Sequence, residues 1–161
     1  MFAWYLCLFC PTQSTASLAV SVVVHFFESL IMSTSPLRVC ATAATLELLQ
    51  SLRAKHGDLM FFQSGGCCDG SSPMCYVRGE FQIGDADVYL GDLDGTPFYM
   101  GADQFEYWRH TQLTIDVVTG NGGMFSLENG SGKRFLTRSR LFSDEECDQL
   151  ALTPVLCGLQ Y

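Results

Sequence analysis

The sequence predicts an α+β fold with an N-terminal helix, a mostly antiparallel sheet of about six short strands and a short C-terminal helix. Leu46, Leu49 and Leu52 recur every three positions, and Gly57 follows as a helix-ending residue. Across residues 58–141, short apolar or alternating runs are separated by glycine-rich turns. The strand–helix–strand spacing of a doubly wound nucleotide-binding sheet does not occur, so that fold is not expected.

Local patterns predict each element. The leucine spacing predicts the first helix over residues 41–56. Asp94–Gly95 predicts a hairpin turn, and residues 102–110 predict one or two helical turns. Ser143 and Glu146 form a capping-box pattern that predicts the start of the last helix. Runs of strand length occur at residues 58–63, 76–83, 87–91, 97–100, 113–118, 124–128 and 134–141.

Composition indicates one globular domain, which we place at residues 32–161. The chain has 161 residues, of which 48% are hydrophobic and 16% are charged, enough to bury a core. A net charge of -8 disfavours binding to nucleic acid, because an acidic surface repels phosphates. Arg134, Arg138 and Arg140 lie at even intervals, which is typical of the solvent face of a strand. The eight cysteines are read as reduced thiols of a cytoplasmic protein.

Residues 1–31 differ from the rest. They hold two apolar runs, at 1–10 and 18–27, and both are shorter than the roughly 18–20 residues of a membrane span. No Lys or Arg precedes the first run, so a secretory signal is not indicated. Met32 opens a polar stretch. We therefore expect residues 1–31 to be a non-native or disordered upstream extension and expect no membrane association, with a membrane anchor as the alternative.

The segment Ser64–Cys75 reads SGGCCDGSSPMC and is the strongest candidate for function. It combines flexible glycines with three thiols and has no bulky aliphatic residue, which is typical of a loop that carries chemistry. Thiolates are soft metal ligands, and three of them with one further ligand satisfy zinc, iron or an iron–sulfur cluster. The candidate ligands are Cys67, Cys68, Cys75, Asp69, His56 and His110.

Two other interpretations of the same cysteines stay open. Cys67 or Cys68 is a candidate catalytic nucleophile, with His110 or His56 as its base. Alternatively, the cysteines are small buried residues beneath a tight turn.

The aromatic stretch at residues 105–110 also has two interpretations. It predicts either an aromatic-walled pocket with Glu106, Arg109 and His110 as polar groups, or an aromatic cluster that seals one end of the sheet, with Arg109 stacked on a ring. Asp116, between Ile115 and Val117 in an alternating strand, is expected to face solvent.

Several long stretches resemble one bacterial family of small uncharacterised proteins. The family is often encoded beside acetaldehyde dehydrogenase genes and sometimes carries that enzyme's name. The resemblance covers residues 39–150 and implies an accessory protein that acts on or with an aldehyde dehydrogenase. The chain is too short to be the dehydrogenase itself. The stretches are HGDLMFFQSGGCCDGSSPMCY, IGDADVYLG, GTPFYM, QFEYWRHTQLTIDVV and GGMFSLENGSGKRFLTRSRLF.

A weaker similarity is to the A-type iron–sulfur carriers, which have the HesB-like fold. The matching features are the GGC turn ending at Cys67, the Ile115–Asp116 pair and the FSLEN segment at 125–129. Those carriers also use a C-terminal CGC pair, where this chain has residues 137–140 (TRSR). The resemblance therefore implies only Cys67 as a ligand, and Cys68 and Cys75 would have to substitute.

Together these features predict a cytoplasmic accessory protein whose thiol loop binds a metal or protects an aldehyde-oxidising partner from oxidation. The alternatives are a small thiol-dependent enzyme and a structural scaffold without metal. Open sheet edges make a homodimer an additional expectation.

Overall fold

In the computed structural model of the chain, residues 35–66 and 70–158 are described. The chain divides into two units, residues 1–34 and 35–161, and all described residues belong to the second. The segment 1–31, expected to be an upstream extension, lies outside the described residues. The helices are α2 (Ala43–His56), α3 (Ala102–Trp108) and α4 (Asp144–Ala151). The strands are β1 (Val39–Ala41), β2 (Leu59–Gln63), β3 (Met74–Val77), β4 (Asp87–Leu93), β5 (Thr96–Gly101), β6 (Thr111–Thr119), β7 (Lys133–Leu141) and β8 (Leu156–Cys157).

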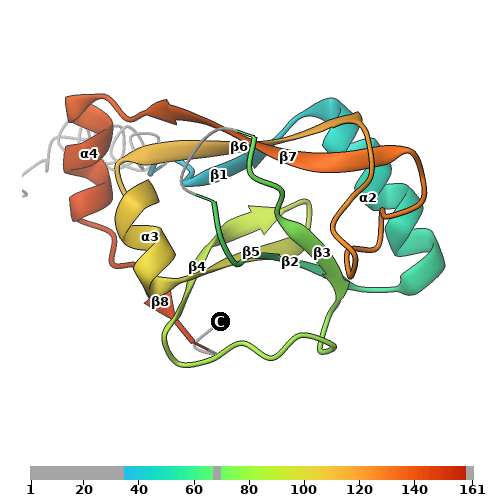
Figure 1. The fold of residues 1–161 in the computed structure, drawn as a ribbon. Coiled ribbons are helices and arrows are strands. Elements are labelled where there is room, and N and C mark those ends of the chain that lie inside the picture. Colours follow the sequence, from blue (N-terminus) through green and yellow to red (C-terminus); the bar gives the residue numbers. More distant parts are fainter. Residues whose placement is uncertain (1–34, 67–69, 159–161) are drawn as a thin grey trace, which may run out of the picture. The chain divides into compact units, whose positions relative to one another are not determined.

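The strands form two mixed sheets, one of three strands in the order β1-β6-β7 and one of five in the order β3-β2-β5-β4-β8. The pairs β1–β6 and β2–β5 are parallel, and the other pairs are antiparallel. The sheets lie over each other as two layers, with α2 at one end and α3 and α4 at the other (Figure 1). The α+β prediction is confirmed, but the strands are divided between two sheets instead of forming one. None of the described helices is long and apolar enough to cross a membrane.

Helix α2 has both of its ends capped. The Thr42 side chain accepts a hydrogen bond from the Thr45 backbone N–H, and Gly57, at φ 83°, donates its N–H to the Arg53 carbonyl. A positive φ is the conformation that favours glycine, so the predicted C-cap is confirmed. The buried leucines are Leu48, Leu49 and Leu52.

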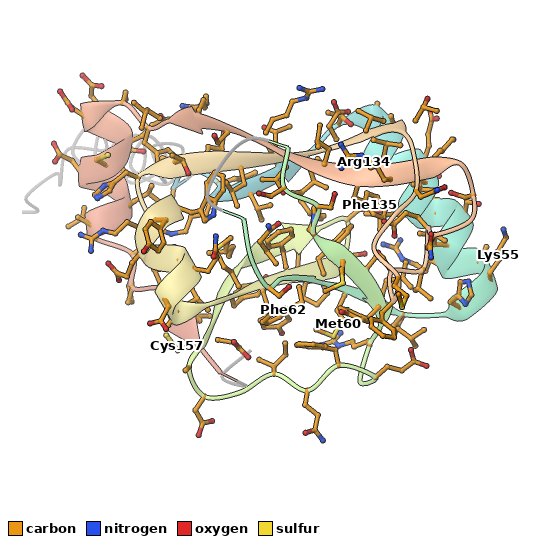
Figure 2. All side chains as sticks on the ribbon, viewed as in Figure 1. Lys55, Met60, Phe62, Arg134, Phe135 and Cys157 are labelled. Carbon is orange, nitrogen blue, oxygen red and sulfur yellow. The ribbon has the colours of Figure 1, made fainter. Side chains whose placement is uncertain are left out.

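The main core lies between the two sheets. Phe61 of β2 contacts Phe98 on the neighbouring strand β5, with ring centroids 5.7 Å apart. It also meets Phe135 of the opposite sheet edge to face, at 4.8 Å. All three rings are fully buried. Figure 2 shows Phe135 between the layers, with Met60 and Phe62 on the other side of the five-stranded sheet. These aromatic contacts join the two sheets into one core.

A second apolar cluster covers the outer face of the five-stranded sheet. Met60, Phe62 and Tyr99 are buried there, and Phe81 and Ile83 pack against them. The strand predicted over residues 76–83 is wrong in its second half, because β3 ends at Val77. Phe81 and Ile83 instead pack against the sheet from the β3–β4 loop. Their alternating spacing therefore comes from this packing and not from hydrogen bonding as a strand.

The strand predicted over residues 124–128 is also wrong, because this segment is a series of turns. The N–H of Ser126 donates to the Gly123 carbonyl, and that of Asn129 donates to the Ser126 carbonyl. Phe125 is 73% exposed and Ser126 is buried, so the apolar alternation does not match a half-buried strand.

The capping box at the start of α4 is confirmed and gives a testable effect. Ser143 accepts from the Glu146 N–H, and the Glu146 carboxylate accepts from the Ser143 N–H. We expect Ser143→Ala to lower the free energy of unfolding by about 1 kcal/mol, because the first turn loses an acceptor. Urea denaturation followed by circular dichroism measures this. Ser51→Ala, at an exposed mid-helix position, is the control, and an equal loss in both variants would refute a capping effect.

Candidate functional site

The thiol loop is the segment Ser64–Cys75, and its last described residues before the cysteines, Gly65 and Gly66, are called the N-terminal shoulder. This shoulder is held in place by α3. Trp108 Nε1 donates to the Gly66 carbonyl at 3.0 Å, and the Gln104 amide donates to the same oxygen. Gln63, at the end of β2, is fully buried, and its Nε2 donates to the Gly65 carbonyl at 2.5 Å. The backbone entering the loop is therefore held by both a helix and a strand. Cys67, Cys68 and Asp69 lie outside the described residues.

The first described residues after the cysteines, Gly70 and Ser71, form the C-terminal shoulder, which is held in place by β7. The Gly70 N–H donates to the Thr137 carbonyl at 2.9 Å, and the Thr137 N–H donates to the Ser71 carbonyl at 2.7 Å. A Cβ at Gly66, whose φ is 92°, would collide with the Ser71 side chain, so the two shoulders touch. Gly66 and Gly70 are nevertheless exposed. The vicinal cysteines are thus connected to the domain at two anchored, solvent-exposed points.

Cys75 has a different setting from the loop shoulders. It is fully buried on β3, and its backbone N–H donates to Ser126 Oγ at 2.8 Å. Burial, with a further contribution from the Glu128 carboxylate, raises the pKa of the Cys75 thiol. A protonated thiol in an apolar core is a small hydrophobic group with little nucleophilicity. When no metal is bound, Cys75 therefore contributes to the packing of the core.

Glu128 is a buried carboxylate that the sequence interpretation missed. It is fully buried, and one oxygen, Oε2, accepts from the Ser126 hydroxyl. The other oxygen, Oε1, has no hydrogen-bond partner among the described residues. A Cβ at Gly122 would overlap Oε1, so the glycine turn closes directly over the carboxylate. Burial raises the pKa of Glu128, although the Ser126 hydrogen bond opposes this. In the sequence, Glu128 precedes Asn129–Gly130, a pattern that predicts an exposed turn residue. Its burial is therefore visible only in the folded structure.

The two candidate histidines lie at separate helix ends. His56 ends α2, His110 follows α3, and both are exposed. Over residues 35–66 and 70–158, no three His, Cys, Asp or Glu side chains gather as a metal site would require. The four described cysteines, Cys40, Cys75, Cys147 and Cys157, are free thiols.

The aromatic stretch around α3 combines features of both interpretations. Trp108 is buried in the core, whereas Tyr107 is 73% exposed. A hollow of about 310 Å³ includes Phe105 and His110 in its lining. The guanidinium that stacks on the Phe105 ring belongs to Arg38, at 5.4 Å from the centroid. The expected stacking of Arg109 does not occur on any ring that the structure describes.

Arg109 instead forms an ion pair with Glu106 at 3.0 Å.

Asp116 faces outward as predicted, but it is half-buried and bonded. Its carboxylate accepts from Arg138 Nε at 2.8 Å and from Thr42 Oγ1 at 3.0 Å. The Arg138 hydrogen bond, followed by the Val117 backbone N–H, lowers the pKa of Asp116. The residue therefore ties the start of α2 to the three-stranded sheet and serves structure.

The described part of the site therefore has exposed loop flanks at Gly66 and Gly70, a buried thiol at Cys75 and a buried carboxylate at Glu128 with one oxygen that lacks a described partner. A family model described as "Domain of unknown function (DUF779)" matches residues 48–141, which include the thiol loop, Cys75 and Glu128. A comparison with curated proteins finds no match. Because the family model spans more than half of the chain, this protein belongs to the DUF779 family.

Proposed function

We propose that this chain is a cytoplasmic accessory protein whose vicinal thiols, Cys67 and Cys68, protect the oxidation-sensitive cysteine of an aldehyde-oxidising partner. The anchoring of both exposed shoulders, at Gly66 and Gly70, carries the proposal. It holds the flanks of the two cysteines at the surface, where a partner protein has access. The resemblance to proteins encoded beside acetaldehyde dehydrogenase supports the choice of partner.

The contrast with Cys75 supports a division of labour among the three thiols. Thiolate is the reactive form of cysteine, and burial disfavours it. The buried Cys75 has a raised pKa and a place in the core cluster. The residues that flank Cys67 and Cys68, Gly66 and Gly70, are exposed, and successive N–H groups of a glycine-rich turn favour a thiolate.

The proposed reaction reverses the first step of cysteine oxidation. The thiolate of Cys67 or Cys68 attacks the sulfur of a cysteine sulfenic acid on the partner, which forms a mixed disulfide and releases hydroxide, protonated to water. A low-molecular-weight thiol then attacks the mixed disulfide and frees the partner's thiol. A second molecule of the small thiol frees this chain's cysteine, and the small thiol leaves as its own disulfide.

The test is protection of an aldehyde dehydrogenase from hydrogen peroxide in the presence of a small thiol. The full chain is expected to preserve dehydrogenase activity, and the double variant Cys67→Ser/Cys68→Ser is expected to lose that effect. Cys157→Ser is the matched control, because Cys157 is an exposed cysteine on β8, far along the chain from the loop. Equal protection by the double variant, or no protection by the full chain, would contradict the proposal.

The second candidate function is metal binding, and Glu128 is the observation that favours it. A buried carboxylate oxygen without a described partner calls for a bound ion or water. A bound cation also favours deprotonation of a nearby thiol, so the raised pKa of Cys75 would reverse. Zinc, iron or an iron–sulfur unit would be held by Cys67, Cys68 and Cys75, with Glu128 added to the earlier candidates Asp69, His56 and His110 as the further ligand.

Elemental analysis of protein purified without oxygen tests this second function. Binding predicts about one metal ion per chain, with loss of most of it in both Cys75→Ala and Glu128→Gln. Glu80→Gln, at an exposed loop position, is the control for the carboxylate substitution. Metal-free wild-type protein, or full metal content in both variants, would remove metal binding and leave the thiol function.

A further inference from the structure

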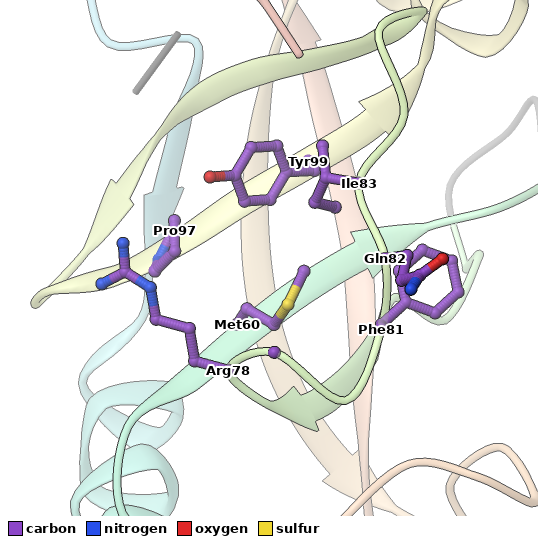
Figure 3. Close-up of a pocket in the computed structure, with 8 residues that line it drawn as sticks. Met60, Arg78, Phe81, Gln82, Ile83, Pro97 and Tyr99 are labelled. Carbon is purple, nitrogen blue, oxygen red and sulfur yellow. The ribbon is translucent and has the colours of Figure 1, made fainter. Parts of the chain in front are cut away.

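A cavity of about 410 Å³ lies on the outer face of the five-stranded sheet, away from the main core. The β3–β4 loop passes below this face and closes the cavity on one side (Figures 1 and 3). Its volume falls in the range of roughly 300–1,000 Å³ that is typical of small-molecule sites. The lining residues are Met60, Arg78, Gly79, Phe81, Gln82, Ile83, Pro97 and Tyr99.

The apolar wall of the cavity is held in place by ring contacts. Phe81 packs on Phe62 of β2, with ring centroids 4.4 Å apart, and stacks on Tyr76 of β3 at 5.0 Å. Met60 and Tyr99 form the part of the wall contributed by the sheet and are themselves buried. The loop is thus fixed to the sheet by aromatic packing beside the cavity, which gives a largely preformed site.

The cavity has a positively charged side chain, Arg78, in its lining. Arg78 is the only charged residue among the described residues that line it. Its side chain is exposed, and its guanidinium makes no hydrogen bond or ion pair with another described residue. Figure 3 shows the guanidinium on the side of the cavity where Pro97 lies, and in this view the Tyr99 hydroxyl points toward that side. In a chain of net charge -8, this arginine has no described acidic partner and can therefore pair with an anionic ligand.

We propose that this cavity binds a small organic carboxylate with an apolar tail, with the tail against Met60, Ile83 and Phe81 and the carboxylate on Arg78. A guanidinium matches a carboxylate through two parallel hydrogen bonds. A single arginine balances a monoanion, whereas a phosphate dianion would need further donors in an acidic protein. Burial of an apolar tail against the apolar walls contributes favourable free energy, because apolar surface is removed from water. This site is separate from the thiol loop and does not depend on its function.

The experiment is titration of the full 161-residue chain with octanoate, followed by calorimetry and by amide chemical shifts. Saturable binding is expected, with the largest shifts in residues 78–83 and 97–99. Arg78→Gln is expected to weaken octanoate binding about tenfold or more, because a charge-assisted pair is lost. Arg78 is exposed, so this variant is expected to fold. Arg109→Gln is the matched control, because Arg109 is exposed and pairs with Glu106 on the surface.

Two further ligands make the class of ligand specific. 1-Octanol is expected to bind more weakly than octanoate, and Arg78→Gln is expected to leave octanol binding unchanged. Octyl phosphate is expected to bind no more tightly than octanoate. Absence of saturable octanoate binding, equal octanoate affinity in wild type and Arg78→Gln, or shifts confined to other parts of the chain would each overturn the proposal. Tighter binding of octyl phosphate would overturn the carboxylate assignment.

Discussion

Replacing Phe61 by alanine is expected to lower the free energy of unfolding by about 3–5 kcal/mol. The Phe61 ring is fully buried and contacts Phe98 in its own sheet and Phe135 in the opposite sheet. Its removal would leave a cavity where the two layers meet, and rigid sheets on both sides would close it only in part. Urea denaturation followed by circular dichroism measures the change.

Phe125→Ala is the matched control for this prediction. It deletes the same atoms from a ring that is 73% exposed, so a change within about 0.5 kcal/mol is expected. If both variants lost the same stability, Phe61 would not be the aromatic link between the two sheets.

Relative to wild type, Glu128→Gln is expected to gain stability in metal-free protein as the pH rises to 8, because it removes the cost of a buried ionised carboxylate, although its amide is still a buried polar group without a partner. The carboxylate is fully buried with Oε1 unpartnered, and burial raises its pKa in the folded state above the ordinary value of 4.5. A group with a raised pKa contributes its stability below the unfolded pKa and loses it as the pH rises through the folded pKa. The wild type therefore pays this cost at alkaline pH, and the neutral glutamine avoids it.

The pH dependence separates this effect from ordinary packing. The stability difference between Glu128→Gln and wild type is expected to be smallest near pH 4.5 and to grow toward pH 8. Thermal or urea unfolding across that range measures it, and Glu80→Gln at an exposed position is expected to show no such trend. A constant difference across the range would mean that the pKa of Glu128 is the same in the folded and the unfolded protein. A destabilised Glu128→Gln variant in metal-loaded protein, with the opposite sign, would support the metal site.

Features set by neighbouring residues were predictable from the sequence. The helix ending at Gly57 and the helix beginning after Ser143 depend on hydrogen bonds within a few residues of each other. The Asp94–Gly95 turn between β4 and β5 is equally local, and its two residues both adopt positive φ. Such contacts leave a signal in a short window of sequence, because the chemistry and the spacing occur together.

Features set by distant residues were not predictable. Strand β1 has three residues and pairs in parallel with β6, more than seventy positions away. The parallel β2–β5 pair likewise divides the strands between two sheets in a way that no local pattern encodes. For the candidate site, the sequence indicated the loop, but the burial of Cys75 and of Glu128 depends on how β3 and the glycine turn pack.

The central proposal is that Cys67 and Cys68 are the reactive thiols, whereas Cys75 is protected in the core. Time-resolved alkylation of metal-free native protein with iodoacetamide, followed by peptide mass mapping, tests it most directly. Modification of Cys67 or Cys68 is expected within minutes, and Cys75 is expected to stay unmodified until urea unfolds the protein, because it is fully buried and its thiol pKa is raised. Alkylation of Cys75 in the folded protein as fast as that of Cys67 and Cys68, or failure of both loop cysteines to react, would contradict the account.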